Sequence, residues 1–237
     1  MSENEPISVV TWKWDNGIHP KKGIKFTADH INRFFKMLKR NTTVPFRPFC
    51  ITDNWDGIDE DINVIPLWDD YRDMGGCYVR LFAFSEEVKT VLGDKFIWFD
   101  IDSVIVGNMD AILTDKADFK AWGDTHPRTP YNGSMIMMKT GARKQVWEDF
   151  HPLRSPSLGK RMGHVGTDQA WIGACLGKYE PKWNTDDGVY SYRVHLKRSP
   201  NPAILPENAK IVFFHGSSDP SKAEMQKLCP WIKEHWQ

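Results

Sequence analysis

The chain has 237 residues, enough for one large domain with a sizeable core. Its 31 basic and 31 acidic residues balance, which argues against a general nucleic-acid-binding protein. No apolar stretch approaches the ~20 residues of a membrane span, and the polar, acidic start does not resemble a signal peptide. The four cysteines form no Cys-x-x-Cys pair, so we expect free thiols and a cytoplasmic location.

The first hundred residues alternate between strand and helix patterns, which is typical of an α/β fold. β-Branched residues near the start predict a strand, and apolar residues recur at helical spacing from Ile31 to Leu38. In chain order we expect a strand at residues 7–12, a loop at 13–22, a helix at 27–40, strands at 48–52 and 62–66, a loop at 68–76 and a helix at 78–91.

The rest of the chain adds strands and helices around a segment rich in proline, glycine and basic residues. That segment, residues 151–165, predicts a mobile loop or a lid on the acceptor side. We expect strands at residues 96–99, 104–106, 119–122 and 134–139, a helix within 141–150, a helix at 167–176, strands at 190–195 and 211–216, and a short helix in the tail.

Two carboxylates, Asp100 and Asp102, directly follow the apolar strand at residues 96–99. Residues i and i+2 of an extended chain point to the same side, so the two side chains are expected to converge and to repel each other. A divalent cation such as Mn²⁺ or Mg²⁺ relieves that repulsion and prefers carboxylate and phosphate oxygens. The pattern therefore predicts a metal–phosphate site at the end of a central strand. An ordinary strand end that faces water is the alternative interpretation.

Other candidate residues have structural alternatives as well. A late apolar strand ends at His215 and Gly216, which favours a ligand role over a buried structural histidine. Arg80 suits either a phosphate contact or a surface salt bridge. Asn132 and Gly133 fit either a ligand contact or a hairpin turn, and the pair Asp168-Gln169 fits either a ligand contact or helix capping.

Taken together, these stretches resemble the metal-dependent nucleotide-sugar glycosyltransferases of the GT-A fold. The chain looks closest to the glycogenin-like and lipopolysaccharide galactosyltransferase-like group (family 8), or to a near bacterial relative. The resemblance rests on a strand ending Asp-x-Asp (residues 96–102), its continuation to Asn-x-Asp (106–110), an Asn-Gly turn before an apolar strand (131–136), an Asp-Gln helix start (166–169), and a late strand ending His-Gly with a lysine beyond it (212–222).

The resemblance implies a central mixed, mostly parallel sheet flanked by helices, and it assigns the candidate residues by position. Asp100, Asp102 and His215 would hold Mn²⁺ or Mg²⁺, Thr11 and Trp12 would lie near the base, Arg80, Gly216 and Lys222 would meet the phosphate or uridine side, and Asn132, Gly133, Asp168 and Gln169 would line the donor-sugar pocket, with Asp168 and Gln169 as catalytic candidates. Two departures are Ile101, where a small residue is common, and the missing Lys-Pro order near Lys222.

The implied protein is a single glycosyltransferase domain, with a nucleotide-binding part at about residues 7–110 and an acceptor and donor-sugar part at about 111–237. It would move a sugar from a nucleotide sugar, most often a UDP-sugar, to a hydroxyl of a glycan, lipid or protein, with retention by analogy. A phosphohydrolase of the haloacid dehalogenase type is a second hypothesis, with Asp100 as nucleophile. A non-catalytic nucleotide-sugar binder on the same fold is the third.

Overall fold

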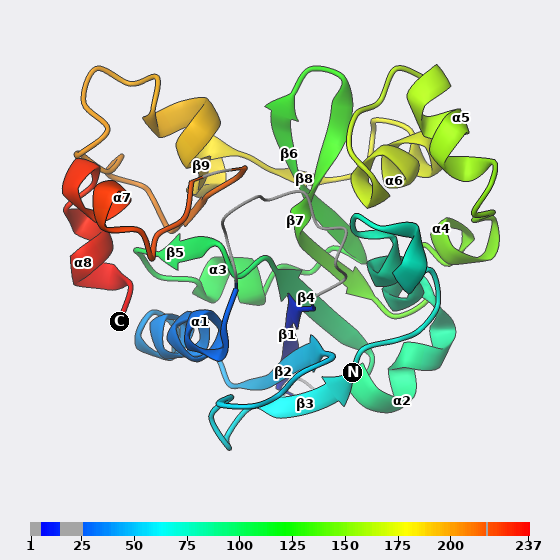
Figure 1. Cartoon of the computed structure of the whole chain (residues 1–237), viewed down its shortest axis with the longest axis horizontal. Helices are drawn as coiled ribbons and strands as arrows, with labels where there is room; N and C mark the ends of the chain where they lie inside the picture. Colours follow the sequence, from blue (N-terminus) through cyan, green and yellow to red (C-terminus); the bar gives the residue numbers. More distant parts are fainter. Residues whose placement is uncertain (1–5, 15–25, 217) are drawn as a thin grey trace.

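A computed structural model describes residues 6–14, 26–216 and 218–237, so most of the expected loop at 13–22 lies outside the described residues. A seven-stranded sheet in the order β3-β2-β1-β4-β7-β6-β8 forms the centre (Figure 1). Its strands are β1 (Ile7–Lys13), β2 (Phe46–Thr52), β3 (Asn63–Pro66), β4 (Lys95–Phe99), β6 (Phe119–His126), β7 (Thr129–Lys139) and β8 (Lys182–Trp183). All neighbouring pairs are parallel except β4–β7 and β7–β6, so the sheet is mixed and mostly parallel, as expected.

A second, three-stranded sheet lies beside the first, in the order β5-β10-β9. It consists of β5 (Ser103–Ile105), β9 (Val189–Ser191) and β10 (Ile211–Phe213). Strand β10 runs antiparallel to β5 and parallel to β9. Because β5 begins soon after β4 ends, this small sheet brings the last third of the chain next to the end of the central strand.

Helices cover both faces of the central sheet (Figure 1). The α-helices are α1 (Ala28–Arg40), α2 (Lys89–Leu92), α3 (Asp110–Leu113), α4 (Gln145–Glu148), α5 (Ser155–Arg161), α6 (Asp168–Leu176), α7 (Ala223–Leu228) and α8 (Trp231–His235). Strand β4 shows why both faces need cover: Ile97 and Phe99 belong to the core with α1 and α8, whereas Phe96 and Trp98 belong to the core with α4 and α6. A strand buried on both faces reads as a continuous apolar run.

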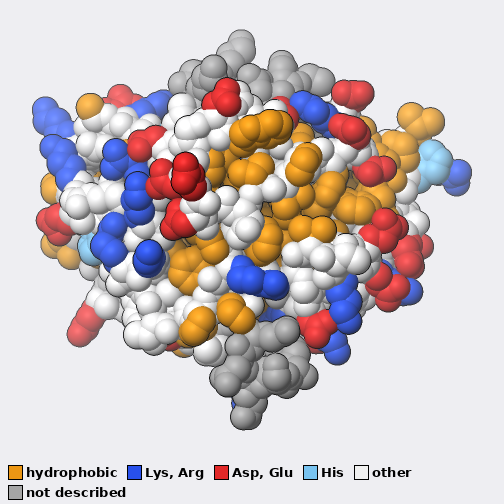
Figure 2. All heavy atoms as spheres, turned by 90° about the horizontal axis from the view of Figure 1, so that it is seen from below, with side chains coloured by type: hydrophobic (Ala, Val, Ile, Leu, Met, Phe, Trp, Pro, Cys, Tyr) orange, Lys and Arg blue, Asp and Glu red, His pale blue; other side chains and the backbone are white. Residues whose placement is uncertain are grey.

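Apolar side chains also reach the surface. Figure 2 shows hydrophobic side chains gathered in the middle of the face seen from below, with charged side chains around them. Trp55 is 58% exposed, so part of the high aromatic content is not used in the core. No helix of the described residues is both long and apolar enough to cross a membrane.

The prediction of one continuous helix at residues 78–91 is wrong. The structure has 3₁₀ turns at η2 (Tyr78–Phe84) and η3 (Glu86–Val88) before the short α2. Ser85 interrupts the run because its backbone is extended, at ψ 149°, and its hydroxyl accepts a hydrogen bond from the N–H of Glu87. Aromatic and β-branched residues also lower the helical preference of this segment, since their side chains lose freedom against the preceding turn.

Two further expectations differ from the structure. Residues 151–165 contain helix α5 rather than an irregular loop, because Pro156 stands in its first turn and Gly159 packs closely on Ala170 of α6. The strand expected at 190–195 stops at Ser191 and continues as the π-helical turn η5 (Tyr192–Leu196).

Candidate active site

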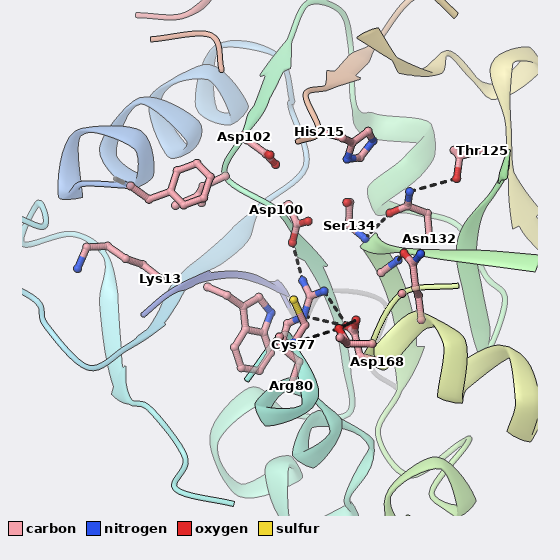
Figure 3. A pocket seen from close by; sticks show the side chains of 18 of the residues that line it. Lys13, Cys77, Arg80, Asp100, Asp102, Thr125, Asn132, Ser134, Asp168 and His215 are labelled. Atoms are coloured by element: carbon pink, nitrogen blue, oxygen red, sulfur yellow. Dashed lines mark hydrogen bonds and ion pairs between the residues drawn. The ribbon is translucent and has the colours of Figure 1, made fainter. Parts of the chain in front are cut away.

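A large pocket of about 1480 Å³ lies where β1, β4 and β7 approach the small sheet. Figure 3 shows Asp100, Asp102 and His215 pointing toward the same part of it, and Arg80 between Asp100 and Asp168. In an open α/β sheet such a crevice beyond the carboxyl ends of the strands is the usual ligand position. Its lining includes Trp12, Lys13, Asp53, Asn54, Cys77, Arg80, Asp100, Asp102, Thr125, Arg128, Asn132, Gly133, Asp168, Gln169, Arg193, Arg198 and His215.

Strand register brings His215 to the Asp-x-Asp segment. Ser103 of β5 pairs with Phe213 of β10 in an antiparallel ladder, and the N–H of Phe214 donates to the carbonyl of Asp102 at 2.7 Å. His215, the next residue after Phe214, therefore lies close to the segment that carries Asp102. The Asp102 side chain is buried, and the Nε2 atom of His215 is buried as well. The histidine ring also stacks on Trp122, at 5.4 Å between centroids.

Arg80 holds two acidic residues together from inside the protein. Its Nε and Nη2 atoms donate to Asp168 Oδ2 at 3.0 and 2.7 Å, and its Nη1 donates to Asp100 Oδ1 at 2.5 Å. Arg80 is 4% exposed and Asp168 is 3% exposed, so water screens this pair little. Burial alone would lower the pKa of Arg80, but the nearby carboxylates outweigh it and hold the pKa well above its ordinary value. Arg80 is thus a buried cation rather than part of a surface salt bridge.

Gly133 is needed at the base of the pocket because the Arg80–Asp168 pair lies against it. A Cβ atom at this position would stand 2.9 Å from Asp168 Oδ2 and 3.0 Å from Arg80 Nη2. The neighbouring Asn132 amide donates to the hydroxyl of Thr125 at 3.1 Å, and its carbonyl oxygen accepts from the N–H of Ser134 at 2.9 Å. The resulting wall is rigid, since its polar side chains are held by hydrogen bonds rather than by the ligand alone.

Most residues expected at the site line this pocket. They are Trp12, Arg80, Asp100, Asp102, Asn132, Gly133, Asp168, Gln169 and His215. Thr11 does not line it, because this buried residue donates its hydroxyl to the carbonyl of Phe49. Gly216 and Lys222 are also absent from the lining, and Lys222 instead precedes α7 as its N-cap residue.

Several lining residues were missed in the sequence. Cys77 contacts the site through its N–H, which donates to the hydroxyl of Thr167 at 3.1 Å. Burial raises the pKa of its thiol to about 12, so it stays protonated and is a poor nucleophile at neutral pH. Arg128, Arg193 and Arg198 line the pocket too. Their positions depend on the β6–β7 hairpin and on the π-helical turn, which carry no local pattern that marks a site.

The residues expected to bind a metal provide suitable donors but not a complete site. Carboxylate oxygens suit Mn²⁺ or Mg²⁺, and a histidine nitrogen is a common metal ligand. Among the residues that the structure describes, no three His, Cys, Asp or Glu side chains are close enough to hold an ion by themselves. Mg²⁺ usually takes one or two carboxylates plus substrate phosphates, so the donor set fits a cation that arrives with a diphosphate. Asp100 would contribute to such a site while Arg80 contacts its Oδ1 atom.

No protein-family model and no curated protein sequence matches the chain. Solved structures do match. The galactosyltransferase LgtC, in complex with donor and acceptor sugar analogues, has a TM-score of 0.60 and 13% identity, over 98% of this chain and 97% of that chain. GlyE from Streptococcus pneumoniae TIGR4, a glycosyltransferase, has a TM-score of 0.58 and 12% identity, over 92% of this chain and 57% of its own. The bifunctional glycosyltransferase WbbM scores 0.55 at 11% identity, over 99% and 52%.

These matches confirm the expected fold. The chain has an α/β fold, with a central mixed, mostly parallel sheet flanked by helices, that matches GT-A glycosyltransferase structures. The similarity to LgtC extends over nearly the whole length of both chains.

Proposed function

We propose that this protein is a metal-dependent glycosyltransferase that moves a sugar from a nucleotide sugar, most simply a UDP-sugar, to a hydroxyl of a glycan, lipid or protein. The observation that carries the proposal is one pocket on a GT-A fold that contains Asp100, Asp102 and His215 together with the buried Arg80–Asp168 pair. A pocket of this volume has room for a donor and part of an acceptor.

The base end of the donor is assigned to the side of β1 and β2. Trp12 lines the pocket there, and edge-to-face contacts with Trp68 and Trp98, at 5.4 and 6.0 Å between ring centroids, hold its ring in place. Asp53 and Asn54, which follow β2, line the same side and supply polar groups. An aromatic surface with a few fixed polar groups is a usual arrangement for binding a flat ring.

The diphosphate end is assigned to Asp100, Asp102 and His215, which would hold Mn²⁺ or Mg²⁺. When bound, the cation stabilises the negative charge that develops on the departing nucleoside diphosphate. Arg80 keeps Asp100 fixed in one orientation through the 2.5 Å hydrogen bond. A carboxylate held in place before the ligand arrives loses less freedom on binding.

The donor sugar is assigned to the wall formed by Asn132, Gly133, Asp168 and Gln169. Asp168 lies at the N-terminus of α6, and Arg80 holds its carboxylate in place at this wall. A fixed anion there stabilises an oxocarbenium-like transition state, or takes part in proton transfer. We propose retention of the anomeric configuration, by analogy with family 8.

The proposal is tested by release of UDP from a panel of UDP-sugars with Mn²⁺, with and without candidate acceptors. We expect EDTA to abolish release. Asp102→Asn should lower turnover by about a hundredfold or more, since metal-based stabilisation of charge is worth several kcal/mol. Asp69→Asn is the matched control, because this carboxylate is 95% exposed and outside the pocket.

Two results decide between this function and its alternatives. If the wild-type protein neither releases UDP nor melts at a higher temperature with UDP and Mn²⁺, the transferase proposal fails. If UDP raises the melting temperature but no sugar turns over, the protein is a binder. A phosphohydrolase of the haloacid dehalogenase type is disfavoured by the GT-A fold.

A further inference from the structure

Two neighbouring strands of the small sheet end at the same edge and carry an arginine and a histidine beyond their ends. Strands β9 and β10 are parallel, and their last paired residues are Ser191 and Phe213. Arg193 and His215 each follow two residues after that pair. Because the two strands end side by side, the π-helical turn that carries Arg193 and the segment that carries His215 leave the small sheet at the same edge. Both residues line the pocket.

The guanidinium of Arg193 reaches the backbone next to His215. Its Nη1 atom lies 3.9 Å from the position that a Cβ atom would take at Gly216. Gly216 has a φ of +72°, so the chain turns there in a conformation that favours glycine. Arg193 is exposed to the pocket, and no carboxylate among the described residues forms an ion pair with it.

A π-helical turn fixes the start of this side chain. The N–H of Lys197 donates to the carbonyl of Tyr192, five residues back, at 2.7 Å. The hydroxyl of Ser191 accepts from the N–H of Val194, and the Tyr192 ring stacks on Phe214 at 5.2 Å. The wide turn lets residues five apart face one way, and Arg198 lines the pocket together with Arg193. Single π turns occur often at functional sites.

We infer that Arg193 is the protein cation that binds the diphosphate of the nucleotide, in the position that the family resemblance assigns to Lys222. Lys222 does not line the pocket, whereas Arg193 lines it and lies close to Gly216, the neighbour of His215. A guanidinium can form two parallel hydrogen bonds to a phosphate, and it stays charged at every working pH. The inference rests on the proposed function, because it names a residue for the leaving group of that reaction.

Binding measurements test it without any turnover. The dissociation constants of UDP and of uridine are measured by calorimetry, with Mg²⁺, for the wild type, Arg193→Ala, Lys222→Ala and Lys197→Ala. Lys197 is an exposed neighbour outside the pocket and serves as the control. We expect Arg193→Ala to weaken UDP binding by roughly tenfold to a hundredfold, the usual effect of losing hydrogen bonds to a charged group. Uridine binding should be unchanged, because uridine has no phosphate.

The possible outcomes distinguish failure of the role of Arg193 from failure of the proposed function. If the wild type binds UDP and Arg193→Ala binds it equally well, or if Lys222→Ala alone weakens it, the inference is wrong and the proposed function stands. An equal loss of uridine and UDP binding in Arg193→Ala also overturns it, since the arginine would then act on the base or on folding. If the wild type binds none of the common nucleoside diphosphates, both the inference and the proposed function fail.

Discussion

Removal of Arg80 leaves a buried negative charge with no cation to balance it. In Arg80→Met the Asp168 carboxylate, 3% exposed, loses the two hydrogen bonds of 3.0 and 2.7 Å. Loss of one partner of a buried ion pair costs roughly 3–5 kcal/mol. In a domain of this size each kcal/mol lowers the melting temperature by about 2–4 °C, so we expect a fall of roughly 6–20 °C.

A second substitution tests the cause of that loss. In Arg80→Met with Asp168→Leu, no uncompensated charge remains at 168, and we expect most of the stability to return, because apolar residues of similar volume often replace a buried pair without cost. Arg143→Met is the matched control. Arg143 also pairs bidentately, with Glu180 at 2.6 and 2.7 Å, but both side chains are partly exposed, at 18% and 17%. We expect that variant to lose roughly 1 kcal/mol or less.

The stabilities of the wild type, Arg80→Met, the double variant and Arg143→Met are measured by thermal unfolding, followed by circular dichroism, and by urea unfolding at pH 7. The reasoning is refuted if Arg80→Met melts within roughly 2 °C of the wild type, which would correspond to less than about 1 kcal/mol. It is also refuted if the double variant is less stable than Arg80→Met, because the penalty would then not come from the unpaired Asp168 carboxylate.

Two further predictions concern the site and the buried thiols. Gly133→Ala would place a Cβ atom 2.9 Å from Asp168 Oδ2 and 3.0 Å from Arg80 Nη2, so we expect sugar transfer to fall by roughly tenfold or more as the pair shifts; transfer at the wild-type rate would contradict this. Burial raises the pKa of Cys50 and Cys77 from 9.0 to about 12, so both should react slowly with a thiol reagent at pH 8. Because the pKa of each thiol is higher in the folded than in the unfolded protein, the contribution of these thiols to the free energy of unfolding is complete below pH 9 and declines as the pH rises toward 12. Fast labelling of the two thiols in the folded protein, or a constant free energy of unfolding up to about pH 11, would count against this prediction.

Local patterns account for the parts of the fold that were predicted well. Helix α1 begins at Ala28 and ends at Arg40, close to the expected range, because its apolar face has a clear helical period. Strand β4 is buried on both faces, so its sequence is a continuous apolar run that is recognisable without any partner. The fold class was confirmed for the same reason: strand and helix patterns alternate, and that alternation favours a parallel sheet.

Local patterns failed where contacts distant in sequence outweighed propensity. Residues 151–165 contain proline and glycine and were expected to form a loop, yet Gly159 lets helix α5 pack closely on α6. The expected helix at 78–91 became 3₁₀ turns around Ser85, with the Arg80 side chain directed toward Asp168 and Asp100. In the first segment, packing between two helices decides the local structure. In the second, Ser85 breaks the helical run, and Arg80 pairs with acidic residues elsewhere in the chain.

The sequence by itself determined that an apolar strand is followed by Asp100 and Asp102, since a continuous apolar run that stops at two carboxylates is visible without any partner strand. Only the tertiary structure decided which other residues meet them. The register of β10 against β5 brings His215 to the same pocket, and the π-helical turn that follows β9 beside β10 places Arg193 there, whereas Lys222 does not line it. Register depends on how whole faces of a sheet are buried, and that depends on the complete core rather than on any single segment.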